Sequence, residues 1–198
     1  MKKMYCIRED YIIRGKNDFL DTSGRSDEYQ NDVYVYAKKI TESHDVKTIS
    51  DVGCGSAYKL LKYFKSFEFN GYDLEPTVTL LKERFPENDW IISDFNSTPK
   101  QSDLVICADV IEHVDDPDEL IGFIMKMNPK HVVLSTPDRD LLYYKLGRSI
   151  VGPPANKHHI REWTFDEFRE YIGRYFNIID QVKIEHEYGQ LIYCTQKK

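Results

Sequence analysis

The sequence has only four cysteines, and no two of them are close together. Cys6, Cys54, Cys107 and Cys194 form no Cys-x-x-Cys pair, which argues against a zinc ribbon and against a dithiol redox site. A domain of this size also needs no disulfide staples. We therefore expect all four thiols to be reduced.

Long apolar runs and an excess of positive charge are lacking as well. No stretch approaches the roughly 18 apolar residues of a membrane-spanning helix, and the start, MKKMYCIRED, contains no apolar signal region. The 27 Lys and Arg stand against 33 Asp and Glu, which gives a formal net charge of -6. Because phosphate binding depends on clustered Lys and Arg, we predict a cytoplasmic protein with no membrane partner and nucleic acid disfavoured as a partner.

The chain of 198 residues is 41% hydrophobic and 30% charged, which is the balance of one globular domain over residues 1–198. After a helical pattern at 29–43, strand patterns alternate with helical ones. This alternation predicts an α/β fold, a Rossmann-like doubly wound seven-stranded sheet with helices on both faces. Two strand-like runs after the helical pattern at 164–176 predict a C-terminal antiparallel hairpin at the sheet edge. The expected strands are 47–53, 67–73, 89–93, 103–110 and 130–136, and the expected helices between them are 56–65, 76–85 and 116–127.

A glycine-containing turn follows the first expected strand. In Asp51-Val52-Gly53-Cys54-Gly55, the two glycines let the backbone turn tightly and approach a ligand, while the amides of the next helix point into the crevice. A plain strand-to-helix turn is the alternative. A dinucleotide fingerprint is disfavoured, because its third small residue is replaced here by Tyr58.

Acidic residues end the next two expected strands. Asp73 comes 22 residues after Asp51, where an acidic side chain accepts hydrogen bonds from ribose hydroxyls. Asp94 is followed by Phe95, and an acid beside an aromatic ring suits the amine and the face of an adenine. The glycine turn and these acids together predict a nucleoside-containing cofactor.

These motifs resemble those of the class I S-adenosylmethionine-dependent methyltransferases. DVGCGSA, GYD and SDF resemble the first three motifs of that family in order, and ADVIEHVDDP at 108–117 resembles the post-strand segment of its small-molecule, ubiquinone-pathway-like branch. The resemblance covers residues 29–198 and implies S-adenosylmethionine as the cofactor. It implies that the methionine part faces Gly53 and Gly55. The full cofactor-binding set that we expect is Asp51, Gly53, Cys54, Gly55, Asp73, Leu74, Asp94 and Phe95.

The candidate catalytic residues are Asp109, His113 and His159. The first two follow the fourth expected strand, and His159 lies in the 137–163 segment, which we predict to be an acceptor-covering insertion. Histidine suits proton removal near neutral pH, so we predict His113 or His159 as the general base. Purely structural histidines are the alternative.

A metal-assisted variant stays open as a minor alternative. Asp109-x-x-Glu112-His113 together with His159 resembles the metal site of the small-RNA 2'-O-methyltransferases. Two carboxylates and two imidazoles can hold a divalent ion that lowers the pKa of an acceptor hydroxyl. Our main interpretation uses no metal.

The expected acceptor is a small molecule. The 137–163 segment holds five Lys and Arg against three Asp and Glu, which suggests an anionic acceptor; a merely solvated basic loop is the alternative. We also expect residues 1–28, with Arg8, Tyr11 and Arg14, to form a lid over the cofactor. We therefore predict methyl transfer to a hydroxyl, or less favourably an amine, of an anionic or sugar-like metabolite. An RNA-directed enzyme and a catalytically silent cofactor-binding protein are the alternatives.

Overall fold

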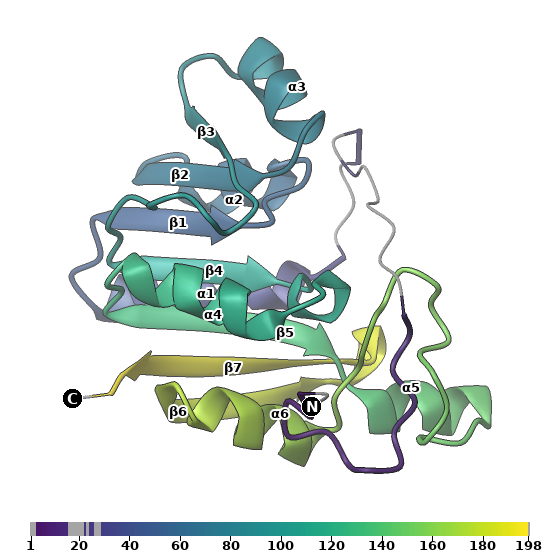
Figure 1. The fold of residues 1–198 in the computed structure, drawn as a ribbon. Helices are drawn as coiled ribbons and strands as arrows, with labels where there is room; N and C mark the ends of the chain where they lie inside the picture. Colours follow the sequence, from purple (N-terminus) through teal and green to yellow (C-terminus); the bar gives the residue numbers. More distant parts are fainter. Residues whose placement is uncertain (1–2, 16–21, 23, 26–28, 198) are drawn as a thin grey trace.

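A seven-stranded sheet with the order β3-β2-β1-β4-β5-β7-β6 forms the centre of the protein (Figure 1). The computed structural model describes residues 3–15, 22, 24–25 and 29–197. The predicted Rossmann-like doubly wound fold is confirmed. The strands are β1 (Thr48–Val52), β2 (Glu68–Asp73), β3 (Asp89–Ile92), β4 (Leu104–Ala108), β5 (His131–Pro137), β6 (Phe176–Ile184) and β7 (Gly189–Gln196).

Helices cover both faces of this sheet, and each face has its own hydrophobic core. Along β4, Leu104 and Ile106 pack with α1, α2 and α3, whereas Val105 and Cys107 pack with α4 and α6. This alternation follows from the period of two along a strand. The helices are α1 (Asn31–Ser43), α2 (Tyr58–Phe64), α3 (Thr77–Arg84), α4 (Pro117–Lys126), α5 (Arg139–Leu146) and α6 (Phe165–Gly173), with short 3-10 turns η1 (Ile111–His113) and η2 (Glu185–Glu187).

The direction in which the chain adds strands reverses between β1 and β4. Both strands are parallel neighbours at the centre of the sheet, with Asp51 opposite Ile106. From β1 the chain moves outward to β2 and β3, and it then returns to β4 and β5 on the other side. Ligands of open α/β sheets bind at the carboxyl ends of the strands at such a reversal.

The C-terminal hairpin is present as predicted. β7 pairs antiparallel with both β5 and β6, which leaves β6 at the edge. The turn between them passes through Tyr188, whose φ of 54° is left-handed. The Tyr188 carbonyl accepts a hydrogen bond from the amide of Asp138 at 2.8 Å, so the hairpin turn is fastened to the end of β5.

The 137–163 segment contains a helix that the sequence analysis missed. Asp138 caps α5 by accepting hydrogen bonds from the amides of Asp140 at 2.9 Å and Leu141 at 3.3 Å. Gly147 ends the helix in the left-handed conformation, with φ of 58°. An Asp before the helix and a Gly after it are ordinary start and stop signals, but the low apolar periodicity between them hid the helix.

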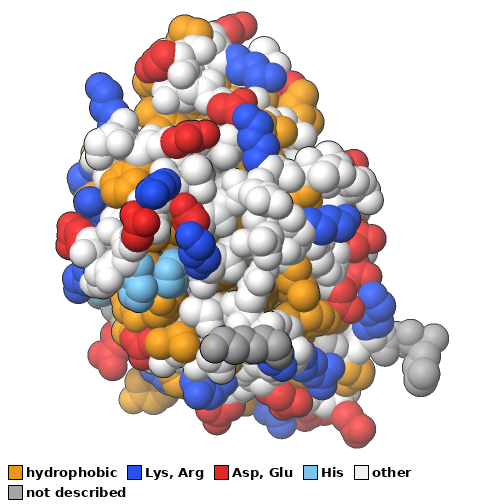
Figure 2. Space-filling model, turned by 90° about the vertical axis from the view of Figure 1, so that its left-hand side faces the viewer, with side chains coloured by type: hydrophobic (Ala, Val, Ile, Leu, Met, Phe, Trp, Pro, Cys, Tyr) orange, Lys and Arg blue, Asp and Glu red, His pale blue; other side chains and the backbone are white. Residues whose placement is uncertain are grey.

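The face at the amino ends of the parallel strands carries charges of both signs. Figure 2 shows Lys and Arg interspersed with Asp and Glu on this side, together with a small group of histidines. His44 and His131 lie with their rings 4.4 Å apart, and His131 contacts the Tyr193 hydroxyl at 2.9 Å. Among the described residues, no helix is both long and apolar enough to cross a bilayer.

Candidate active site

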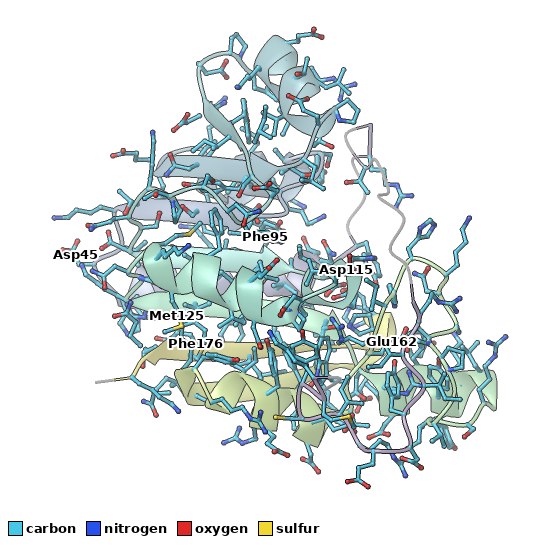
Figure 3. The ribbon with its side chains drawn as sticks, viewed as in Figure 1. Asp45, Phe95, Asp115, Met125, Glu162 and Phe176 are labelled. Atoms are coloured by element: carbon cyan, nitrogen blue, oxygen red, sulfur yellow. The ribbon has the colours of Figure 1, made fainter. Side chains whose placement is uncertain are left out.

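A cavity of about 880 Å³ opens at the carboxyl ends of the central strands. Its walls come from the β1–α2 turn, from the ends of β2, β3 and β4, and from the 137–163 segment. Figure 3 shows Asp115 and Glu162 at this end of the sheet and Asp45 at the opposite end. The cavity therefore lies where the reversal of strand order places a ligand.

The glycine turn forms one wall of the cavity, and both glycines are needed there. Gly53 and Gly55 have φ values of 77° and 52°, which favour glycine. A Cβ atom on Gly53 would collide with the Val110 side chain, and one on Gly55 would lie 2.5 Å from the Thr22 hydroxyl oxygen. A side chain at either position would therefore clash with the protein itself, so the turn keeps its shape only with glycine.

Asp73 ends β2 beside this turn, and its carboxylate is fixed by two backbone amides. The amide of Gly55 donates to Oδ2 and the amide of Leu74 donates to Oδ1, both at 2.7 Å. A carboxylate oxygen has more than one acceptor site, so Asp73 can also accept from hydroxyls in the cavity that it lines. This geometry fits the ribose of a nucleoside cofactor.

Replacing Asp73 with asparagine is expected to weaken the binding of S-adenosylhomocysteine at least tenfold. The variant removes the charge from hydrogen bonds to the ribose, which are worth about 1.5–3 kcal/mol. Isothermal titration calorimetry measures the change. Glu68→Gln, at the exposed start of the same strand, is the control and should leave the affinity unchanged. Equal affinity in Asp73→Asn and the wild type would contradict the role of Asp73.

Asp94 and Phe95 follow β3 and line the same cavity. The Asn96 amide donates to Asp94 Oδ1 at 3.1 Å, and this bond lowers the pKa of the carboxyl. Phe95 has a left-handed φ of 70° and packs against Phe123, with 5.7 Å between the ring centroids. An ionised acceptor and a fixed ring therefore lie side by side, as an adenine requires.

Asp51 lies apart from the other predicted cofactor-binding residues. Gly53, Cys54, Gly55 and Leu74 line the cavity, but Asp51 is not among the described residues that line it. It is fully buried and accepts a hydrogen bond from the Tyr34 hydroxyl at 2.9 Å. Burial raises the pKa of Asp51 to about 7. Tyr34, which the sequence analysis did not single out, is the cavity-lining partner of this acid.

Three of the candidate acceptor-side residues converge at the other end of the cavity. Potential ligand atoms of Glu112, His113 and His159 all lie within 4.8 Å of one another. Asp109 is not in this group. Its φ of 52° is left-handed, and its carboxylate accepts a hydrogen bond from the Ser135 hydroxyl at 2.5 Å. Asp109 thus lines the same cavity as the two histidines but lies outside the ligand cluster that the metal-assisted alternative expects it to join.

His113 is poorly suited to be a general base near neutral pH. Its Nδ1 lies 2.8 Å from the His158 carbonyl oxygen, so this nitrogen carries the proton and Nε2 carries the lone pair. Burial and the neighbouring His159 lower the pKa of His113 to about 4. A group with this pKa holds an abstracted proton weakly at pH 7, whereas its lone pair remains available to a metal. His159 is left as the better candidate for the base.

Glu112 adds a buried carboxyl to the cluster. Its side chain is buried and accepts a hydrogen bond from the Thr136 hydroxyl at 3.0 Å. Burial and the nearby Asp109 raise the pKa of Glu112 well above its ordinary value. A carboxyl beside two imidazole lone pairs is a donor set that suits a small divalent cation, so the residues present fit such an ion.

The expected basic, acceptor-covering 137–163 segment is not confirmed for two of its three arginines. Arg139 and Arg161 are buried rather than exposed to a substrate. Arg161 donates to the carbonyls of Val114 at 2.7 Å and Asp115 at 2.9 Å, which ties the 137–163 segment to the loop after η1. The charge excess of this segment is thus partly structural.

The 137–163 segment meets the cavity through other residues. Asn156 and His159 supply polar groups, and the aliphatic contacts come from Leu142, Leu146 and Ala155. The turn of the C-terminal hairpin adds Glu187 and Tyr188. The sequence does not predict this last contribution, because its only local signal is a Tyr-Gly turn, and the closeness of that turn to the cavity depends on sheet order.

Residues 3–15 pack against the 137–163 segment. This position differs from the expected lid over the cofactor. The amides of Ile12 and Arg14 donate to the carbonyls of Val151 and Ile160, both at 2.9 Å. Residues 3–15 are not among those that line the cavity, whereas Thr22 and Arg25 are. Arg8, Tyr11 and Arg14 therefore do not form the lid. Residues 1–2, 16–21, 23 and 26–28 of the expected lid lie outside the described residues.

This sheet order, the glycine turn and the two strand-end acids fit a Rossmann-like protein with a nucleoside cofactor, the class to which the S-adenosylmethionine-dependent methyltransferases belong. The comparisons with known proteins agree. The methyltransferase domain family model matches residues 27–188, and the chain belongs to this family.

Individual relatives differ in the acceptors that their names record. The small RNA 2'-O-methyltransferase of Mus musculus is 27% identical over 172 residues, which cover 70% of this chain and 40% of that protein. Magnesium protoporphyrin IX methyltransferase from Synechocystis, solved with S-adenosylhomocysteine, has a TM-score of 0.66 at 16% identity and is matched over 92% of this chain and 90% of its own.

A solved small RNA methyltransferase has a TM-score of 0.64 at 19% identity, over 92% of this chain and 27% of that one. The chain thus spans well under half of these RNA-directed relatives. The expectation that nucleic acid is disfavoured as a partner finds no support in the comparisons.

Proposed function

We propose that the protein transfers the methyl group of S-adenosylmethionine to a hydroxyl of a small, sugar-like acceptor, and that His159 receives the hydroxyl proton. The observation that carries this proposal is the position of His159, which lines the cavity with Nε2 as an acceptor nitrogen. Polar groups beside aliphatic side chains suit the hydroxyls and the apolar faces of a sugar. Since Arg139 and Arg161 are buried, the argument for an anionic acceptor loses much of its basis.

The chain contributes mainly orientation. S-adenosylmethionine, when bound, supplies a methyl group on a positively charged sulfur. Gly53 and Gly55 hold the cofactor through the backbone, Asp73 orients the ribose, and Asp94 with Phe95 orients the adenine. His159 Nε2 would accept the hydroxyl proton as the acceptor oxygen forms its bond to the methyl carbon and the methyl–sulfur bond breaks, which would leave S-adenosylhomocysteine. Positioning of this kind lowers a displacement barrier by several kcal/mol.

A panel of free sugars and nucleotide sugars, incubated with radiolabelled S-adenosylmethionine, tests this proposal. His159→Gln is expected to lower turnover about a hundredfold or more, because general-base catalysis contributes roughly 10²–10⁴ in rate, while the affinity for S-adenosylhomocysteine stays unchanged. His158→Gln, a half-buried neighbour that is not among the described residues lining the cavity, is the matched control and should keep full turnover. Wild-type turnover in His159→Gln would rule out His159 as the general base.

The second candidate function is metal-assisted methylation of an RNA hydroxyl. The convergence of Glu112, His113 and His159 within 4.8 Å favours it, as does the similarity to small RNA 2'-O-methyltransferases. These three residues would hold a divalent cation, which supplies Lewis acidity to a hydroxyl.

Exhaustive chelation followed by titration with Mn²⁺ separates the two functions. If the second candidate is right, chelation abolishes methylation of short RNA, Mn²⁺ restores it, and Glu112→Gln binds Mn²⁺ at least tenfold more weakly than the wild type. If the first is right, chelated protein still methylates a sugar from the panel. Glu119→Gln, a cavity-lining acid outside the cluster, is the control for the Mn²⁺ titration.

A further inference from the structure

A buried chain of charged groups reaches His159 from the side away from the cofactor turn. His159 Nδ1 lies 2.6 Å from Glu162 Oε1, and Glu162 Oε2 lies 3.1 Å from Arg139 Nη1. The relative exposures of His159, Glu162 and Arg139 are 7%, 0% and 1%. A buried charge is retained only where partners compensate it, and these three side chains compensate one another.

The hydrogen bonds around His159 define which of its nitrogens carries the proton. A carboxylate only accepts hydrogen bonds, so the nitrogen facing Glu162, Nδ1, must donate. On the other side, Asn156 Nδ2 lies 3.0 Å from Nε2. The Asn156 amide is oriented by its oxygen, which accepts from the His158 backbone amide at 3.0 Å. Its nitrogen therefore donates to Nε2, and both sides of the ring require the Nδ1-protonated tautomer.

Arg139 fixes the far side of Glu162. Its guanidinium lies between the rings of Tyr11 and Tyr143, at 4.3 Å and 4.2 Å from their centroids. Its remaining donors bond to the carbonyls of Ile150 and Gly152 and to the Tyr11 hydroxyl. Tyr11 also accepts from the Glu162 amide at 2.9 Å. The guanidinium is thus held on every side, and it holds one carboxylate oxygen of Glu162 in turn.

We propose that Glu162 is a positioning residue for the reaction, which holds His159 in the Nδ1-protonated tautomer with Nε2 directed into the cavity, and that Arg139 fixes Glu162 in this role. Asn156 occupies Nε2 until an acceptor hydroxyl or a cation replaces it. Whether Nε2 accepts a proton or binds a metal rests on the proposed function. The inferred tautomer does not depend on that choice, because proton acceptance and metal binding both need the lone pair on Nε2.

Glu162→Gln provides a sharp test, because Arg139 can only donate hydrogen bonds. The glutamine oxygen must therefore face Arg139, which turns the glutamine NH₂ group towards His159 Nδ1. We expect the proton to move to Nε2, so that the tautomer is reversed. In the double variant Arg139→Met/Glu162→Gln, the glutamine oxygen is free to accept from Nδ1 again, and the wild-type tautomer should return.

Long-range ¹H–¹⁵N NMR spectra of the imidazole rings near neutral pH report the tautomer in the full chain without any acceptor. In the wild type, the low-field signal of an unprotonated nitrogen should belong to His159 Nε2, and in Glu162→Gln it should belong to Nδ1. His113 is the internal control, because its tautomer is set by the His158 carbonyl. An unchanged His159 tautomer in Glu162→Gln, or a wild-type ring protonated on Nε2, overturns the proposal.

Asn156→Asp gives a second test outside the buried ion pair. Its carboxylate would attract a proton to Nε2, and if Glu162 holds the Nδ1 proton, His159 becomes doubly protonated. A ring protonated on Nε2 alone would instead show that Glu162 does not hold Nδ1, and so overturn the proposal. If the sugar and RNA assays fail while these NMR results hold, the proposed function is wrong and the positioning by Glu162 stands.

Discussion

Replacing Arg139 with methionine is expected to lower the free energy of unfolding by about 3–5 kcal/mol, the range measured when one partner of a buried ion pair is removed. The variant leaves Glu162 buried without its cation. It also removes the donors that hold the carbonyls of Ile150 and Gly152 and the ring contacts with Tyr11 and Tyr143. Urea unfolding followed by circular dichroism measures the loss.

Two further variants show whether the uncompensated charge causes this loss. Arg148→Met changes the same residue type just beyond α5 at an exposed position, and it should stay within about 0.5 kcal/mol of the wild type. Arg139→Met/Glu162→Gln removes both charges, so it should recover part of the stability lost in Arg139→Met. A loss of unfolding free energy below about 1 kcal/mol in Arg139→Met, or a double variant less stable than Arg139→Met, would show that the uncompensated charge of Glu162 is not the cause.

The cofactor side of the site could be predicted from the sequence because its signals are local. A glycine turn and strand-end acids keep their positions relative to the strands, and a parallel sheet brings the carboxyl ends of those strands to one edge. Gly53, Asp73 and Asp94 line one cavity for this reason. Asp51 is the exception, because it lies within the strand and points to Tyr34 instead.

The acceptor side depends on contacts that counting charges does not capture. The charge excess of the 137–163 segment includes Arg139 and Arg161, yet both are buried, and their partners include residues distant in sequence. Residues 3–15 pack on the 137–163 segment through Tyr11 and neighbouring amides. Asp109 is close to His113 in the sequence, but its left-handed φ and its hydrogen bond with Ser135 leave it outside the cluster of Glu112, His113 and His159. Each of these differences arises from tertiary packing.

Replacing Asp51 with asparagine is expected to raise the free energy of unfolding above pH 7 by about 4 kcal/mol. Burial raises the pKa of Asp51 from its ordinary 3.8 to about 7, and its Oδ1 has no hydrogen-bond partner among the described residues. Between these two pH values the native state binds more protons at this site than the unfolded state. The site's contribution to stability therefore falls as the pH rises from about 4 to 7, at about 1.4 kcal/mol per pH unit.

The difference in the free energy of unfolding between Asp51→Asn and the wild type separates the effect of Asp51 from that of other buried acids. This difference, measured by urea unfolding without cofactor, should be small near pH 4, grow up to pH 7 and then level off. Asp103→Asn is the opposite control. Although burial opposes the effect, the Lys130 ammonium and two backbone amides lower the pKa of Asp103 to about 2, so this acid stabilises the protein above pH 4 and its loss should destabilise it there. A pH-independent difference between Asp51→Asn and the wild type would contradict the raised pKa of Asp51.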